Sequence, residues 1–177
     1  ALTASTVQAT APAFNMNGTD FTYSIWVKPD PNNSAGKRTI LSQPEQGVVG
    51  PALLMKDGTD VKFQWSGSQY WPYSDADGWY TNQLRPGAWN HIAVTFINSG
   101  ANAGTLTFYV NGETLPAQNT GTRRPPVTYS FAFGSNFYGA VDELRIHRRA
   151  YNAAEIRALY AEYATPYVFP LDEPPCA

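Results

Sequence analysis

Residues 131–160, FAFGSNFYGAVDELRIHRRAYNAAEIRALY, hold the pattern of strand and helix that decides the fold of this chain. Side chains alternate through residues 140–148, which predicts a β-strand. Asp142, Leu144 and Ile146 point to one face of that strand. Because Leu144 and Ile146 are apolar, we expect this face to be the buried one, with Asp142 at the end of the buried row.

A helix with a defined beginning is predicted directly after the strand. Asn152 has the short polar side chain that suits an N-cap, and Glu155 stands three positions later as its capping-box partner. Apolar side chains then recur at helical spacing and form one stripe, made of Ile156, Leu159, Tyr160 and Tyr163. We expect the helix to pack this stripe across a layer of strands.

The rest of the chain reads as short strands separated by turns. Residues 21–28 alternate clearly, and Asp57-Gly58 and Asn111-Gly112 are strong hairpin signals between β-rich runs. Short strands with a helix only at the end indicate two packed antiparallel sheets. The predicted fold is therefore an all-β, antiparallel, two-sheet jelly-roll sandwich with one short C-terminal helix. We expect this domain to span residues 1–165, followed by an extended tail over residues 166–177.

Four segments carry a resemblance to a known family. They are FTYSIWVKP at 21–29, WNHIAVTF at 89–96, LTFYVNGE at 106–113 and GAVDELRIHRRAYNAAEIRALY at 139–160. In this order they resemble the laminin-G-like, concanavalin-A-like jelly-roll domains, whose last core strand carries a similar D-E pair before a basic turn and a short helix. The resemblance implies the fold but no particular ligand, because this fold serves many unrelated functions.

Composition narrows the class of protein. The chain has 177 residues, enough for one well-buried domain, and only 15% of them are charged. A formal net charge of −2 provides no basic field, which argues against nucleic acid or an anionic membrane as partner. Cys176 is the single cysteine and cannot form an intrachain disulfide. The start at Ala1 fits an excised piece of a larger secreted or cell-surface protein.

The sequence contains no recognisable catalytic motif. Jelly-roll glucanases use an E-x-D-x-x-E run, which is absent, and no G-x-S-x-G occurs. Asp142 and Glu143 are adjacent, so on a strand they face opposite sides and do not share a substrate. His91 and His147 have no Ser or Cys nucleophile pattern beside them, and His91 fits a structural histidine of the family. We expect a protein without enzymatic activity.

Aromatic rings crowd the segment KFQWSGSQYWPYSDADGWYTNQLRPGAW at residues 62–89, where no strand or helix period holds. Sugars present apolar C–H faces and hydroxyl rims, so they favour flat rings beside carboxylates and amides. The candidate ligand-binding residues are Trp65, Gln69, Tyr70, Trp71, Tyr73, Asp75, Asp77, Trp79, Tyr80 and Asn82. We expect Tyr70, Trp71 and Tyr73 to form the exposed plate. The alternative is that the rings fold over the edge of the sandwich as a satellite cluster.

Tyr138 and two carboxylates complete the set of candidates. Tyr138 lies in a loop that is expected to flank the same rim, with a structural role as the alternative. The family resemblance implies a structural Ca²⁺ at the sheet edge, with Asp142 as a ligand and Asp20 beside it. A carboxylate that caps backbone N–H groups is the alternative for Asp142. Asp75–Gly78 resembles part of a calcium loop but lacks the remaining ligands.

These observations predict a lectin-like, non-catalytic carbohydrate-binding module that forms part of a larger secreted protein. Its expected partner is a glycan or polysaccharide, with neighbouring domains of the parent protein as possible further contacts. The alternative is a structural or protein-interaction laminin-G-like domain of an adhesin or multidomain enzyme. In that case the aromatic segment would pack against a partner protein.

Overall fold

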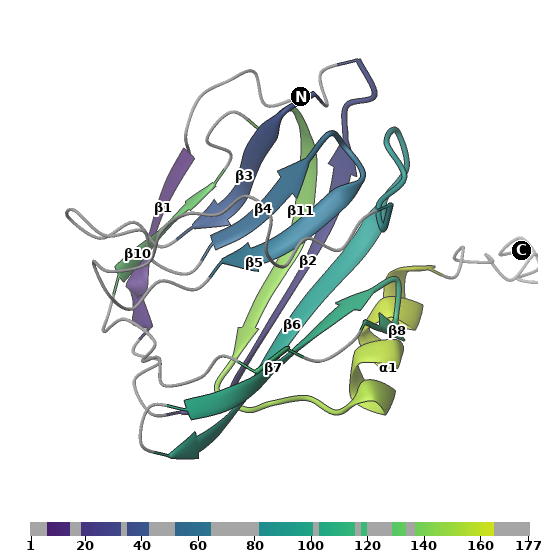
Figure 1. The fold of residues 1–177 in the computed structure, drawn as a ribbon. Coiled ribbons are helices and arrows are strands. Elements are labelled where there is room, and N and C mark those ends of the chain that lie inside the picture. The colour runs from purple at the N-terminus through teal and green to yellow at the C-terminus, as the bar shows by residue number, and fades with distance from the viewer. Residues whose placement is uncertain are drawn as a thin grey trace, which may run out of the picture.

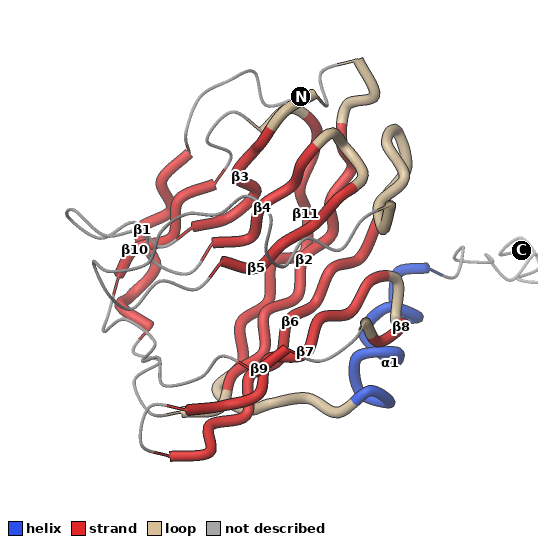
Figure 2. The backbone as a smooth tube through the Cα atoms, viewed as in Figure 1, coloured by secondary structure: helices blue, strands red, loops and turns tan. Residues whose placement is uncertain are grey.

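Two antiparallel sheets packed face to face, with one helix on the outside, make up the computed structural model (Figures 1 and 2). The structure describes residues 7–14, 19–32, 35–42, 52–64, 82–100, 103–115, 118–119, 129–133 and 137–164. Sheet I has the strand order β1-β10-β3-β4-β5, with β1 at Val7–Phe14, β10 at Tyr129–Phe133, β3 at Lys37–Ser42, β4 at Ala52–Lys56 and β5 at Asp60–Gln64. The predicted two-sheet fold is confirmed.

Sheet II has the strand order β11-β2-β6-β7-β8, and β9 also pairs with β7. Its strands are β11 at Gly139–His147, β2 at Phe21–Pro29, β6 at Asn90–Gly100, β7 at Ala103–Val110, β8 at Glu113–Thr114 and β9 at Gln118–Asn119. Strand β2 pairs with β11 on one side and β6 on the other, so it lies inside the sheet. The helix, α1, spans Ala153–Ala164 and follows β11 directly.

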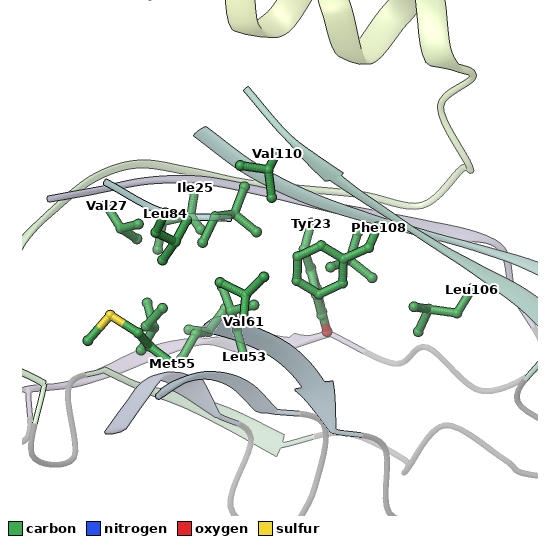
Figure 3. Packing of buried hydrophobic residues seen from close by; sticks show 14 of the residues in the cluster. Tyr23, Ile25, Val27, Leu53, Met55, Val61, Leu84, Leu106, Phe108 and Val110 are labelled. Atoms are coloured by element: carbon green, nitrogen blue, oxygen red, sulfur yellow. The ribbon is translucent and has the colours of Figure 1, made fainter. Parts of the chain in front are cut away.

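The core lies between the two sheets. Every second residue of β2 from Phe21 to Val27 belongs to it, and Phe21 stacks on Phe96 of β6 with ring centroids 5.2 Å apart. In Figure 3, Ile25 and Val27 of sheet II face Leu53 and Met55 of sheet I across this layer. The facing side chains interlock because each strand presents every second residue to the other sheet.

Helix α1 covers the opposite, outward face of sheet II (Figure 3). We call the covered surface, which contains Trp26, Ala93 and Tyr109, the helix seat. Ile156 is fully buried and packs with Ala93 and Tyr109, and Leu159 joins the same small cluster. Three outward-facing residues of β2 are consequently buried as well, with exposed fractions of 0% for Thr22, 3% for Ser24 and 8% for Trp26, whereas Lys28 near the end of the strand is exposed. Within the described residues, no helix is long and apolar enough to cross a membrane.

The predicted capping box at the start of α1 is confirmed. Asn152 Oδ1 accepts a hydrogen bond of 3.0 Å from the Glu155 N–H, and Glu155 Oε2 accepts one of 2.8 Å from the Asn152 N–H. The prediction for the last residue of the apolar stripe is wrong. Tyr163 is 44% exposed, and the Arg145 guanidinium lies 5.2 Å from its ring centroid, so its side chain lies at the rim of the helix seat.

Strand β11 contains a bulge that the alternation of the sequence does not reveal. Asp142 pairs with Trp26 and Arg145 pairs with Ser24, so two residues of β11 oppose one residue of β2. Glu143, inside the bulge, has a φ of 48°. A bulge of this kind adds one residue to the strand and shifts every later side chain to the other face.

The bulge overturns the predicted orientation of Asp142. Val141, rather than Asp142, packs against the core together with Leu144 and Ile146. Asp142 is exposed, and its Oδ1 accepts a 2.8 Å hydrogen bond from the N–H of the next residue. The prediction was wrong because it assumed an uninterrupted pleat through residues 140–148.

Both predicted hairpins are confirmed. Asp57 and Gly58 have φ values of 50° and 75° between β4 and β5, and Asn111 and Gly112 have 52° and 81° between β7 and β8. These are the positive angles that a type I′ turn requires. In the second hairpin the turn also contacts α1, because a Cβ on Gly112 would lie 3.1 Å from Cδ1 of Tyr160.

Strand β4 is buried on both faces. Leu53 and Met55 belong to the core, whereas Ala52 and Leu54 alternate with them and point away from it. Ala52 and Leu54 nevertheless have exposed fractions of only 2% and 3%. An apolar residue on the outward face of a two-layer sandwich stays exposed unless more of the chain covers it. The outward face of sheet I is therefore covered at Ala52 and Leu54 of β4.

We expect Gly112→Ala to destabilise the protein more than Gly100→Ala. Both glycines have a positive φ, 81° and 83°, so alanine costs roughly 1–2 kcal/mol at either position. Only Gly112 meets a neighbour, because nothing lies within 4 Å of a Cβ on Gly100. Crowding of Tyr160, which stacks on Trp26, should add about 1 kcal/mol or more to the cost at Gly112. Urea unfolding measures the difference, and equal costs at the two glycines would contradict the seat described for α1.

Candidate binding site

Most residues of the predicted binding segment lie outside the described residues. These are Trp65, Gln69, Tyr70, Trp71, Tyr73, Asp75, Asp77, Trp79 and Tyr80. Asn82 and Tyr138 are described, together with the strand that precedes the segment and the loop that follows it. The structure therefore defines where the chain enters and leaves the segment.

The two ends of the segment lie at opposite ends of the edge strand β5. Gln64, the last residue of β5, pairs with Ala52, whereas Asp60, its first residue, binds Asn82. Gln64 follows Asp60 by four positions along the strand, which corresponds to roughly 13 Å. Residues 65–81 therefore connect the two ends of an edge strand of sheet I.

The chain is held firmly where it returns to the sandwich. The Asn82 N–H donates to Asp60 Oδ1 at 2.9 Å, and the N–H groups of Gln83 and Leu84 donate to the Thr59 carbonyl at 2.9 and 2.8 Å. Leu84 is 3% exposed and belongs to the core. Asn82 is itself exposed and has a φ of 57°, a left-handed conformation that asparagine tolerates better than most residues. The Asn82 side chain is thus presented to solvent from a fixed backbone.

The loop that follows presents an exposed aromatic residue that the site prediction missed. Buried Asn90 braces this loop, since its Oδ1 accepts from the Arg85 N–H and its Nδ2 donates to the Arg85 and Ala88 carbonyls. Trp89, beside it, is 44% exposed. The sequence contained the necessary signal, because an inward Asn90 at the start of a strand places Trp89 on the outward face.

Tyr138 makes contacts within the domain. The Arg38 guanidinium lies 5.3 Å from its ring centroid, and its carbonyl accepts a 3.0 Å hydrogen bond from the Asp30 N–H. Tyr138 is half-buried. A ring that already holds a cation over one face has that face occupied, so these contacts favour the structural alternative for this residue.

The two carboxylates proposed for calcium are far apart. Asp142 pairs with Trp26 of β2, whereas Asp20 directly precedes Phe21, the first residue of β2. Trp26 follows Asp20 by six positions of extended chain, which corresponds to roughly 20 Å. Asp20 Oδ1 accepts a 2.8 Å hydrogen bond from the Asn98 N–H. The structure therefore does not bring Asp142 and Asp20 to one metal site. Within the described part of the chain, no group of three His, Cys, Asp or Glu residues is arranged to hold a metal ion.

Calcium at Asp142 alone stays a prediction, which thermal unfolding tests. An ion that binds the folded state raises Tm in calcium over EDTA by mass action. We expect Asp142→Asn to abolish that rise because it removes the carboxylate charge. Asp20→Asn is the matched control and should leave the rise unchanged. Equal Tm values of the wild-type protein in calcium and in EDTA would contradict the prediction.

A buried Ser–His pair lies beneath α1. Ser24 Oγ and His91 Nε2 are 2.7 Å apart, although 67 residues separate them in the sequence, so no local motif reveals the pair. Burial, together with the charge of Arg145, lowers the pKa of His91 to about 4. His91 Nδ1 has no hydrogen-bond partner within the described structure. Both side chains are buried, and the structural role expected for His91 stays a prediction.

The architecture defines a jelly-roll domain of two packed antiparallel sheets with one short helix after the last strand. Residues 3–157 match the concanavalin A-like lectin/glucanases superfamily, and the chain belongs to this family. Among curated proteins, no match to the chain is found.

The solved structures to which this chain is similar include binding domains of botulinum neurotoxins. The chain is similar to the binding domain of botulinum neurotoxin serotype D, with 18% identity, 88% of this chain and 42% of that chain covered, and a TM-score of 0.60. It is also similar to the botulinum neurotoxin DC binding domain in complex with rat synaptotagmin II, with 12% identity, coverage of 82% and 36%, and a TM-score of 0.62.

The same botulinum neurotoxin DC domain in complex with SialylT gives 12% identity, coverage of 82% and 36%, and a TM-score of 0.61. Identities this low establish a shared fold alone. The chain spans about two fifths of the length of these binding domains or less.

Proposed function

We propose that this domain is a non-catalytic carbohydrate-binding module of a secreted or cell-surface protein. The rings of the segment, with Tyr70, Trp71 and Tyr73 foremost, stack on sugar faces. Hydroxyl groups of the sugar bind the polar side chains of the segment, which are Gln69, Asp75, Asp77 and Asn82. Trp65, Trp79 and Tyr80 complete the set of proposed sugar-binding residues. Stacking suits this ligand because pyranose rings have apolar C–H faces.

The observation that carries the proposal is the attachment of the segment to the frame. Asn82 is held by Asp60, and the N–H groups of the next two residues are held by Thr59, so the end of the segment has a fixed position. A fixed attachment lowers the ordering cost that a ligand would otherwise have to offset on binding. Among the described residues, the core is built from the strands of both sheets together with Leu84 and Phe137.

The comparisons support a binding role of this kind. The solved domains with the same fold are binding domains, and one of them was solved both with SialylT and with rat synaptotagmin II. These complexes support a binding role and favour neither a sugar nor a protein as the ligand of this chain. The aromatic composition of residues 65–80 is what favours a sugar for this chain.

A second candidate function is a structural or protein-interaction domain. The burial of Ala52 and Leu54 on the outward face of sheet I favours it, because it shows that this face is covered rather than open. If rings of the segment provided the cover, they would form the satellite cluster and leave no exposed plate. The two functions therefore differ in whether Trp71 reaches solvent.

A glycan array probed with the wild-type protein and with Trp71→Ala tests the proposal. We expect the wild type to bind at least one glycan class and Trp71→Ala to lose about tenfold in affinity, since one stacked ring contributes roughly 1–2 kcal/mol. Tyr163→Ala removes an exposed aromatic ring from α1 and is the matched control. It should retain full binding.

Two outcomes would contradict the carbohydrate proposal. The first is a correctly folded wild-type domain that binds no glycan on the array. The second is glycan binding that Trp71→Ala leaves unchanged, which would place the sugar elsewhere on the domain. A large loss of unfolding free energy in Trp71→Ala would instead show a buried ring and support the scaffold function.

A further inference from the structure

Both histidines of the chain lie beneath α1 or the turn that leads into it. His91, on β6, is 1% exposed and contacts Ser24 through Nε2. Its ring centroid lies 5.2 Å from that of Trp26 and 6.1 Å from that of Tyr160, which belongs to α1. His91 Nδ1 is buried and has no hydrogen-bond partner in the described structure. Protonation of Nδ1 would therefore create a buried imidazolium whose new N–H has no acceptor in the described structure.

His147, on β11, occupies a similar position at the beginning of the helix seat. Its Nδ1 lies 3.0 Å from the hydroxyl of Tyr151, and its buried Nε2 has no partner in the described structure. Thr22 fixes the same turn to β2, since its hydroxyl donates to the Arg149 carbonyl at 2.7 Å and accepts from the Tyr151 N–H at 2.9 Å. The turn into α1 therefore contacts a half-buried imidazole whose Nε2 atom is buried.

The charged groups around the two imidazoles disfavour protonation. Arg145 lowers the pKa of His91, after burial as the main cause, and burial followed by Arg149 and Arg145 lowers the pKa of His147. The nearby carboxylates bind these arginines. Arg145 donates to Glu143 and Glu162, and Arg149 donates to Glu155. Thr22, Ser24 and Trp26 of β2 and Glu143 and Arg145 of β11 lie beside the two histidines. Arg149 and Tyr151 of the connecting turn and Tyr160 and Tyr163 of α1 complete this surrounding. The remaining acidic groups of α1, Glu155 and Glu162, bind Arg149 and Arg145.

We propose that α1 is an acid-released cap, which leaves the outward face of sheet II when His91 and His147 become protonated, while the two-sheet core stays folded. Release lets water solvate the charged imidazoles, which removes the cost of holding them buried. Release uncovers little apolar surface in comparison with unfolding of the core, because Ile156 is the one fully buried side chain of the helix. The face that is uncovered contains Trp26, Ala93 and Tyr109.

The direction and size of the effect follow from proton linkage. A histidine whose pKa is depressed in the closed state binds protons more tightly in the released state, so acid favours release. The free-energy difference that favours the closed state over the released state is largest above pH 6.5 and decreases as the pH falls toward 4. For His91 alone, the ratio of released to closed helix should rise about tenfold by pH 5.5 and about 80-fold by pH 4.5. Glu155 and Glu162 have lowered pKa values, so their ion pairs persist through most of this range.

Hydrogen exchange measured by mass spectrometry between pH 7.5 and 4.5 tests the proposal. After correction for the intrinsic pH dependence of exchange, protection of residues 153–164 should fall by tens of fold, whereas β2 and β6 should remain protected. His91→Gln and His147→Gln each keep a neutral side chain at every pH. Each should reduce the loss of protection, and the double variant should abolish it. Glu155→Gln is the control, since it weakens the start of α1 at every pH but leaves the acid response in place.

Equal loss of protection in the wild type and in the double variant would overturn the proposal. Loss of protection in α1, β2 and β6 together would also overturn it, because it would show global unfolding. Should the glutamine variants fail to fold, NMR titration of the wild-type protein decides the question, since its two histidines give two resonances. Titration of both near pH 6.5 without exposure of α1 would contradict the proposal. Depressed titration that coincides with loss of α1 protection would support it.

Discussion

The burial of strand β2 on both faces is the constraint on which the rest of the structure depends. One face supplies Phe21, Ile25 and its other apolar residues to the core, and the other face is covered by α1. A strand buried on both sides leaves its polar outward residues without water, so each needs a partner. Thr22 and Ser24 find theirs in the turn before α1 and in His91. The helix therefore stabilises the sheet through specific polar contacts as well as through apolar packing.

This arrangement separates the frame of the domain from its proposed ligand site. The core and the helix seat lie on the two faces of sheet II, whereas the aromatic segment is attached to the edge of sheet I at Gln64 and Asn82. A rigid frame with a segment fixed at its edge is a common basis for binding, because the scaffold positions the loop at little entropic cost. The family match and the solved domains agree with the two-sheet fold of this frame.

Local signals in the sequence predicted local structure well and failed where the structure depends on distant residues. The cap of α1 involves Asn152 and Glu155, three positions apart, and was predicted correctly. The bulge at Glu143 and the pairing of Ser24 with His91 depend on register between strands, which no single segment encodes. The same limit applies to the site. The aromatic composition indicated a ligand class, but the attachment of Asn82 to Asp60 depends on where the hairpin turn places that carboxylate.

The central claim is that folding and ligand binding reside in separate parts of this domain. Replacement of residues 65–81 by a Gly/Ser linker long enough to join the ends of β5 tests it most directly, with urea unfolding as the measurement. We predict a cooperative transition. The loss in unfolding free energy should be no larger than the roughly 2–3 kcal/mol that exposure of Leu54 and Ala52, on the outward face of sheet I, would cost. Loss of the cooperative transition would show that the segment is part of the core and would contradict the account.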